Sequence, residues 1–185
     1  MHEKNLVIVL APGFEETEAV GTADVLKRVG FKVRLAGLDS VVVPSSAGTR
    51  IQTDLLFRDV DLNQIDALVL PGGMPGAVNL RDSQAVIEAL QVMHRSGKVV
   101  AAICAAPIVL ERAGLSNGRK MTGYPSTNQG LPDLVYTGAR TECDDRIVTG
   151  KGPGVSFEFA ARIAAALGAD PAKIQAVLDG MFVLR

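Results

Sequence analysis

Residues 98–107 read KVVAAICAAP, and this stretch decides the fold that the sequence predicts. Residues 99–103 form a short apolar run, which is typical of a strand buried on both faces of a parallel sheet. Cys104 follows directly, with alanines two residues before and after it, and Pro107 stands where a helix would begin. A nucleophile on a tight strand-to-helix turn needs small flanking residues, so we interpret this stretch as a nucleophile elbow with alanine in place of glycine.

The rest of the chain repeats this alternation of apolar runs and segments of helical period. Strands are predicted at residues 6–11, 32–38, 67–70 and 99–103. Helices are predicted at residues 15–29, 83–95, 106–113 and 157–167, with a last helix from Pro171. Strands that alternate with helices build βαβ units, so we expect an α/β fold with a flavodoxin-like, open and mostly parallel sheet and helices on both faces.

Turn residues support these limits. Gly30 and Gly97 follow the first two long helices, as glycines do after a helix C-terminus, and Asp82 is the predicted N-cap of the second. Residues 41–54 and 120–149 turn to short β-rich pieces, which predicts a hairpin and edge strands. We find no repeat and no linker, so residues 1–185 are expected to form a single domain.

Composition narrows the classes of function. Nineteen Lys and Arg against twenty Asp and Glu leave a net charge of −1, so nucleic acid is not an expected partner. Two histidines and two cysteines lie without ligand spacing, so no metal is expected. The N-terminal apolar run, residues 6–11, is too short for a signal sequence or a membrane span, and the cysteines do not resemble a disulfide framework. We therefore expect a cytoplasmic protein with no membrane partner.

Carboxylates follow the first predicted strand. Glu15 and Glu18 are three residues apart and share a helix face that can look over the edge of the sheet. Acids in a first helical turn also complement the helix dipole, and that simpler explanation stays open. Because these acids would repel a phosphate, a nucleotide-binding module is disfavoured, and no cofactor is expected.

A glycine-rich turn, PGGMPG at residues 71–76, follows the third predicted strand. Its backbone N–H groups could bind an anion, or its glycines could serve only the turn.

Cys104 needs a partner for proton transfer if it is a nucleophile rather than a buried core cysteine. His2 lies near the terminus, and His94 is expected at the far end of the neighbouring helix, so neither histidine fits. Glu15, Glu18 and Tyr124 remain as candidates. We expect the helix N-terminus to lower the pKa of the Cys104 thiol, and a nearby thiolate to raise the pKa of a glutamate.

Four stretches together resemble the ThiJ/PfpI superfamily, in the branch of the human parkinsonism-associated deglycase and the bacterial YajL. They are GFEETEAV, LPGGMPGAVNL, VVAAICAAP and GKGPGVSFEFA, and they run in order from residue 13 to residue 160. The resemblance implies that Cys104 is the nucleophile and Glu18 its hydrogen-bonded carboxyl. It also implies that Gly73 and Ala105 supply backbone donors around the sulfur. Arg28 would be an anion-site arginine near the interface of a homodimer.

Three positions depart from the pattern of that superfamily. Ala105 stands where the protease-like branch has a histidine after its cysteine, so peptidase chemistry lacks its base. Tyr124 stands where the human-type sequence has a histidine, and Ala47 or Arg50 falls where it has a second arginine.

Cys143 precedes two aspartates in a predicted hairpin turn, and we expect it to be exposed and less reactive.

Two functions follow from the resemblance. The first is a cofactor-free glyoxalase and deglycase, in which Cys104 attacks methylglyoxal or glyoxal and Glu18 relays a proton. The second is a sensor of oxidative stress or chaperone-like protein whose Cys104 is oxidised to a sulfinate.

Overall fold

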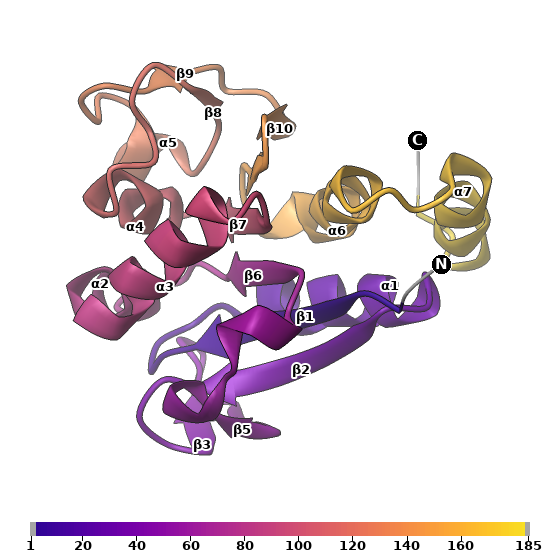
Figure 1. Cartoon of the computed structure of the whole chain (residues 1–185), viewed down its shortest axis with the longest axis horizontal. Coiled ribbons are helices and arrows are strands. Elements are labelled where there is room, and N and C mark those ends of the chain that lie inside the picture. The colour runs from indigo at the N-terminus through magenta and orange to yellow at the C-terminus, as the bar shows by residue number, and fades with distance from the viewer. Residues whose placement is uncertain (1–2, 184–185) are drawn as a thin grey trace.

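The centre of the molecule is a twisted sheet of seven strands in the order β10-β11-β7-β6-β1-β2-β5 (Figure 1). The computed structural model describes residues 3–183. Every neighbouring pair is parallel except β10 and β11, so the predicted open, mostly parallel sheet is confirmed. The strands are β1 (Asn5–Leu10), β2 (Lys32–Gly37), β5 (Leu55–Leu56), β6 (Ala67–Leu70), β7 (Val99–Ile103), β10 (Thr141–Asp144) and β11 (Ile147–Gly150).

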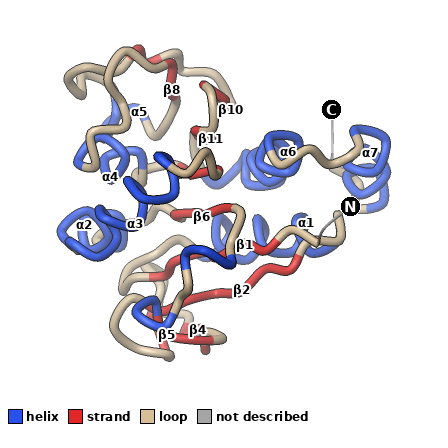
Figure 2. The backbone as a smooth tube through the Cα atoms, viewed as in Figure 1, coloured by secondary structure: helices blue, strands red, loops and turns tan. Residues whose placement is uncertain are grey.

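The central strands are apolar on both faces because helices cover both sides. All residues of β6, β7 and β11 are buried. Helices α2 (Gly76–Asp82), α3 (Gln84–Arg95) and α4 (Pro107–Arg112) cover one face. The other face packs against α1 (Thr22–Arg28), α6 (Ser156–Ala166) and α7 (Pro171–Gly180). Figure 2 shows the two helical layers with the sheet between them.

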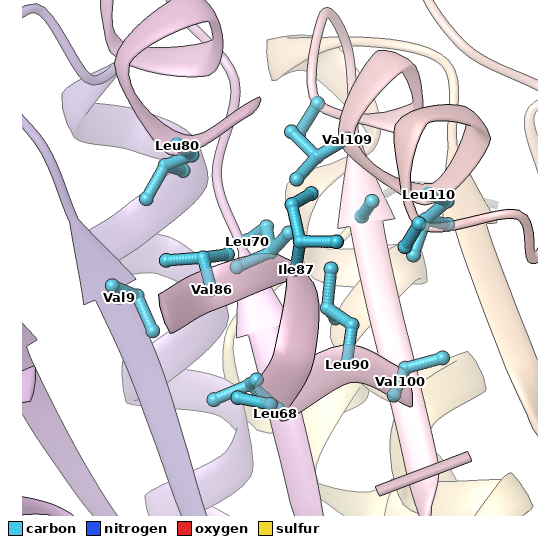
Figure 3. Packing of buried hydrophobic residues seen from close by; sticks show 14 of the residues in the cluster. Val9, Leu68, Leu70, Leu80, Val86, Ile87, Leu90, Val100, Val109 and Leu110 are labelled. Carbon is cyan, nitrogen blue, oxygen red and sulfur yellow. The ribbon is translucent and has the colours of Figure 1, made fainter. Parts of the chain in front are cut away.

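The hydrophobic core is therefore divided by the sheet into two clusters. Figure 3 shows part of one of them, the cluster in which Val86, Ile87 and Leu90 of α3 pack together with Leu68 of β6 and Val100 of β7. These five side chains are at most 4% exposed. The apolar residues of α3 recur at helical spacing, so one stripe of the helix packs on the sheet.

Most predicted elements agree with the structure, and the differences occur at element ends. The strands at residues 67–70 and 99–103 are confirmed residue for residue, and α7 begins at Pro171 as expected. The helix predicted at residues 15–29 instead starts as a π-helical turn, η1 (Thr17–Gly21), and continues as α1. Gly30 and Gly97 have φ values of +98° and +68°, which confirms them as glycines after a helix end.

Helix α2 was not predicted, because its sequence begins within the glycine-rich turn. The helix that follows, α3, is capped by Ser83, whose hydroxyl accepts a hydrogen bond from the Val86 N–H. Asp82 is the last residue of α2, so its prediction as the N-cap was wrong. Because Asp82 still belongs to helix α2, the N-cap of α3 lies one residue later, at Ser83.

Two excursions with strands of their own leave the central sheet. The predicted hairpin at residues 41–54 is present as β3 (Val42–Pro44) and β4 (Arg50–Gln52), which pair antiparallel. Beyond α4, β8 (Lys120–Met121) and β9 (Val135–Tyr136) form a parallel pair that brackets α5 (Pro125–Asn128). Short 3-10 turns complete the chain as η2 (Phe57–Asp59), η3 (Leu62–Gln64) and η4 (Pro153–Val155). Over residues 3–183, no helix combines the length and apolar character needed to cross a membrane.

Candidate active site

The turn after β7 holds Cys104 in a left-handed backbone conformation, with φ of +61°. A residue with a side chain pays about 1–2 kcal/mol for this conformation, so surrounding contacts must hold it. The Cys104 N–H donates to the carbonyl of Gly150 at 2.9 Å, which anchors the turn to the end of β11. Ala102 and Ala106 are fully buried beside it, and the turn leads into Pro107, the first residue of α4. The strand-to-helix turn inferred from the sequence is present.

Glu18 reaches the same place from η1, the turn that follows β1. Its side chain is 1% exposed, and Oε2 accepts a hydrogen bond from the Gly72 N–H at 2.7 Å. The carboxyl group also interacts with the Cys104 thiol. Oε1 is buried and has no other hydrogen-bond partner among residues 3–183. One carboxyl oxygen is thus fixed by the backbone, and the other is free to exchange a proton.

Burial controls the protonation of Glu18. Loss of hydration raises the pKa of its carboxyl from an ordinary 4.5 to about 7, and the negative charge of Glu15 adds to this. Hydrogen bonds from the Cys104 thiol and the Gly72 N–H oppose the rise without cancelling it. The pKa of this glutamate thus rises as expected, but the cause differs: burial raises it, and the Cys104 thiol, which was expected to raise it, lowers it. A carboxyl with a pKa near 7 can both accept and return a proton at neutral pH.

The expected lowering of the Cys104 pKa was wrong. Burial of the thiol, together with the charge of Glu18 and the hydrogen bond to it, raises the pKa of Cys104 to about 12. The N–H groups of Ala105 and Gly73 lower it by less. Helix α4 has only six residues, and its dipole does not outweigh burial beside a carboxylate. These interactions therefore favour the protonated thiol of Cys104 at neutral pH.

The backbone N–H groups of Gly73 and Ala105 both lie at the Cys104 sulfur. They come from the turns after β6 and β7, which end side by side in the sheet. Gly73 has φ of +86°, and a Cβ on it would lie 2.5 Å from the nitrogen of Glu15. A Cβ on Gly72 would lie 2.8 Å from the nitrogen of Ala105. These glycines are thus required because three turns of the chain meet at the sulfur.

Glu15 and Arg28, two of the predicted supporting residues, are occupied elsewhere. Glu15 Oε2 accepts the Glu18 N–H at 2.7 Å, so this carboxylate caps the start of η1 rather than facing the thiol. Arg28 pairs with Asp24 at 2.9 Å, exposed in the last turn of α1. Ten residues of helix separate it from Glu18, about 15 Å along the axis. Within one chain, the structure does not bring Arg28 to Cys104.

Tyr124 reaches Cys104 through its backbone. Its N–H donates to the Cys104 carbonyl at 2.7 Å, while the ring is 48% exposed beside Gly152. Sequence reasoning missed Asn128, whose Nδ2 donates to the same carbonyl at 2.7 Å. It also missed the Gly72 N–H that orients Glu18. These contacts join residues 24 and 54 positions apart, so no local pattern could reveal them.

The remaining cysteine and histidine lie apart from this site. The predicted hairpin is present as β10 and β11, but Cys143 lies in strand β10 and is half-buried, so the expectation that it is exposed was wrong. Burial is the largest cause that raises the pKa of its thiol. His94 lies in the last turn of α3, with Nε2 3.3 Å from Arg119. In residues 3–183 no three potential metal-ligating side chains gather together.

These features define a class of protein: an open α/β sheet whose strand-to-helix turn carries a cysteine beside a buried glutamate. Comparison with known proteins makes the class specific. Residues 4–166 match the model of the DJ-1/PfpI family, and the chain belongs to that family. The resemblance inferred from the four motifs is thus confirmed.

Three relatives illustrate the match. The protein dj-1beta of Drosophila melanogaster is 39% identical over 186 residues, with 97% of each sequence covered. Its crystal structure superposes with a TM-score of 0.94, covering 99% of this chain and 100% of that one at 37% identity. The glutathione-independent glyoxalase DJR-1.2 of Caenorhabditis elegans is 35% identical over 163 residues and 87% of each sequence. An oxidized DJ-1 of Toxoplasma gondii has a TM-score of 0.92 at 32% identity, covering 98% of this chain and 100% of that one.

Proposed function

We propose that this chain is a glutathione-independent glyoxalase that needs no cofactor and acts on methylglyoxal or glyoxal. The observation that carries the proposal is the pair formed by the Cys104 thiol and the buried Glu18 carboxyl, whose pKa of about 7 suits proton transfer at neutral pH. A relative that covers 87% of this chain bears the name of that activity.

The reaction begins when Glu18 takes the thiol proton and the sulfur attacks the aldehyde carbon. The alkoxide that forms takes a proton from Glu18, which gives a hemithioacetal and restores the carboxylate. The N–H groups of Gly73 and Ala105 stabilise negative charge at the sulfur and near it.

Glu18 then removes the hydrogen from the former aldehyde carbon and returns a proton to the neighbouring carbon. The proton of the hemithioacetal hydroxyl moves to the oxygen on that neighbouring carbon, so the hemithioacetal becomes the thioester of a 2-hydroxy acid. Water hydrolyses the thioester, which releases lactate from methylglyoxal or glycolate from glyoxal and restores the Cys104 thiol. The net reaction adds one water and needs no oxidant, reductant or metal. Repair of the early adducts of these aldehydes with amines and thiols, a deglycase activity, would use the same nucleophile.

The proposal includes a cytoplasmic homodimer. It is supported by two exposed apolar side chains next to the helix that carries Glu18: Val20 is 47% exposed and Phe157 is 36% exposed. The Phe157 ring lies 3.1 Å from the Cβ position of Gly21, the residue that follows Val20. Sedimentation of the purified chain tests the dimer.

The test of the enzyme is lactate formed from methylglyoxal in the absence of glutathione. We expect turnover by the wild type, no turnover by Cys104→Ser, and a loss of at least a hundredfold in Glu18→Gln. Cys143→Ser is the matched control, because it removes the other thiol, and it should retain full activity. Unchanged lactate production by Cys104→Ser would contradict the mechanism.

The second candidate function is an oxidation sensor, in which Cys104 is converted to a sulfinate. The same two N–H groups and a protonated Glu18 could hold the sulfinate oxygens. Titration with peroxide followed by intact mass tests it. If the protein is a sensor, oxidation of Cys104 should stop after two oxygens are added, and Cys143 should stay reduced. A sensor has no need to turn over a substrate, so this outcome does not depend on lactate being formed.

A further inference from the structure

The carbonyl group of Cys104 is held by a segment outside its own strand-to-helix turn. Two donors reach it at 2.7 Å each, the Tyr124 N–H and the Asn128 Nδ2. Both belong to the short helix α5 or its N-cap, in the excursion between β8 and β9. The left-handed Cys104 is thus fixed through its N–H by Gly150 and through its carbonyl by α5.

The orientation of the Asn128 amide is fixed by its neighbours. Nδ2 lies 2.7 Å from the Cys104 carbonyl and 3.0 Å from the Tyr124 carbonyl. Carbonyl oxygens only accept hydrogen bonds, so the amide nitrogen rather than the amide oxygen must face them. The side chain is 1% exposed, and its Oδ1 has no partner within residues 3–183. Burying an amide oxygen without a hydrogen-bond donor destabilises the folded state. We therefore attribute the presence of this amide to the hydrogen bonds that its nitrogen donates.

The backbone is shaped to let the amide approach. Gly123 precedes α5, and a Cβ at that position would lie 2.5 Å from the Asn128 Nδ2 and 2.9 Å from the Cys104 carbonyl oxygen. Any larger residue would separate α5 from the nucleophile turn. Gly123 therefore serves the same contact as Asn128.

We propose that Asn128 is a positioning residue for the nucleophile: its amide holds the Cys104 carbonyl and so keeps the cysteine in the left-handed turn that presents its sulfur to Glu18. Without this donor the turn can relax toward the more stable right-handed conformation, which rotates the sulfur away from Glu18 and from the N–H groups of Gly73 and Ala105. The effect on turnover rests on the proposed glyoxalase activity. The effect on the thiol itself does not.

The test is Asn128→Leu, which removes the donor but keeps nearly the same shape, so that water is not admitted to replace it. Gln129→Leu is the matched control, because it makes a similar change on the exposed neighbouring residue. Both changes are made with Cys143→Ser, so that Cys104 is the only thiol. The measurements are the pH profile of iodoacetamide alkylation and the kcat and KM for methylglyoxal, with a melting curve to establish folding.

We expect Asn128→Leu to lower kcat at least tenfold with KM changed less than threefold, and to shift the pH profile of alkylation, because the thiol no longer faces Glu18. Gln129→Leu should match the parent in every measurement. A folded Asn128→Leu whose alkylation profile superimposes on that of the parent overturns the proposal. If Asn128→Leu does not fold, Asn128→Ala replaces it. Failure of both to fold would make the residue purely structural and overturn the proposal as well.

The outcomes separate this proposal from the enzyme assignment. If the wild type forms lactate and Asn128→Leu matches it in rate and alkylation, only the role of Asn128 fails. If the wild type forms no lactate, the glyoxalase fails, and the alkylation profile alone then decides whether Asn128 positions the thiol.

Discussion

Glu18→Gln should stabilise the fold at alkaline pH, because the wild type buries a carboxyl that must ionise there. The pKa of Glu18 rises from 4.5 to about 7 on folding, so the native state binds the proton more tightly than the unfolded chain. Between these values the free energy of unfolding falls as the pH rises, and above pH 7 the full cost is present. Each tenfold change in proton affinity corresponds to a free energy of about 1.4 kcal/mol, so ionisation of Glu18 lowers the free energy of unfolding by roughly 3 kcal/mol in total.

Glutamine keeps the shape and can still accept the Gly72 N–H, but it carries no charge. Urea denaturation at pH 5 and pH 8 measures the free energy of unfolding of both proteins. We expect the gain of the variant over the wild type to be about 2.5 kcal/mol larger at pH 8 than at pH 5. Subtracting the gain at pH 5 from the gain at pH 8 cancels the part of the stability difference between an amide and a neutral carboxyl that does not depend on pH.

The control is Glu88→Gln, which removes a carboxylate from the exposed surface of α3 and should show no comparable growth with pH. A gain for Glu18→Gln that is equal at both pH values would refute the reasoning. It would mean that Glu18 loses its proton in the folded protein as readily as in the unfolded chain.

Two further predictions follow from the geometry of the site. The kcat/KM for methylglyoxal should rise with pH and level off above about 7, because the reaction begins with the Glu18 carboxylate. At pH 5 it should lie on the order of a hundredfold below the plateau, and a flat profile from pH 5 to pH 8 would contradict this role. Gly73→Ala should lose more than about 2 kcal/mol of stability in urea denaturation, because its Cβ would lie 2.5 Å from backbone atoms of Glu15 and Gly13. It should also lose turnover, and a variant with wild-type Tm and kcat would show that the turns at the sulfur are not tightly packed.

The sequence predicts the parts of this site that are local. Residues 99–107 combine an apolar strand, a cysteine between alanines and a proline, and each feature depends only on its neighbours in the chain. The spacing of Glu15 and Glu18 likewise placed both acids on one helix face, but it could not tell which would face the thiol. The structure separates them: Glu15 caps the backbone of η1 and Glu18 turns inward.

The features that could not be predicted are those that depend on packing between distant segments. The pKa of Cys104 rises because burial outweighs a short helix, and burial is a property of the assembled sheet. Asn128 lies in a stretch of turn residues with no periodic pattern, so nothing in the sequence relates it to a cysteine 24 positions earlier. Helix α2 was not recognised because its first residue, Gly76, and the two glycines before the helix, Gly72 and Gly73, serve contacts with other turns.

The immediate surroundings of Cys104 come from four separate turns of the chain. Gly150 holds its nitrogen, α5 and its N-cap hold its carbonyl, and the turns that contain Glu18 and Gly73 surround its sulfur. For protein engineering this means that the reactivity cannot be moved as a short cassette. Residues 98–107 grafted onto another parallel sheet would carry the bend and the thiol without their acid–base surroundings. A successful transplant would have to include the whole carboxyl-terminal rim of the sheet.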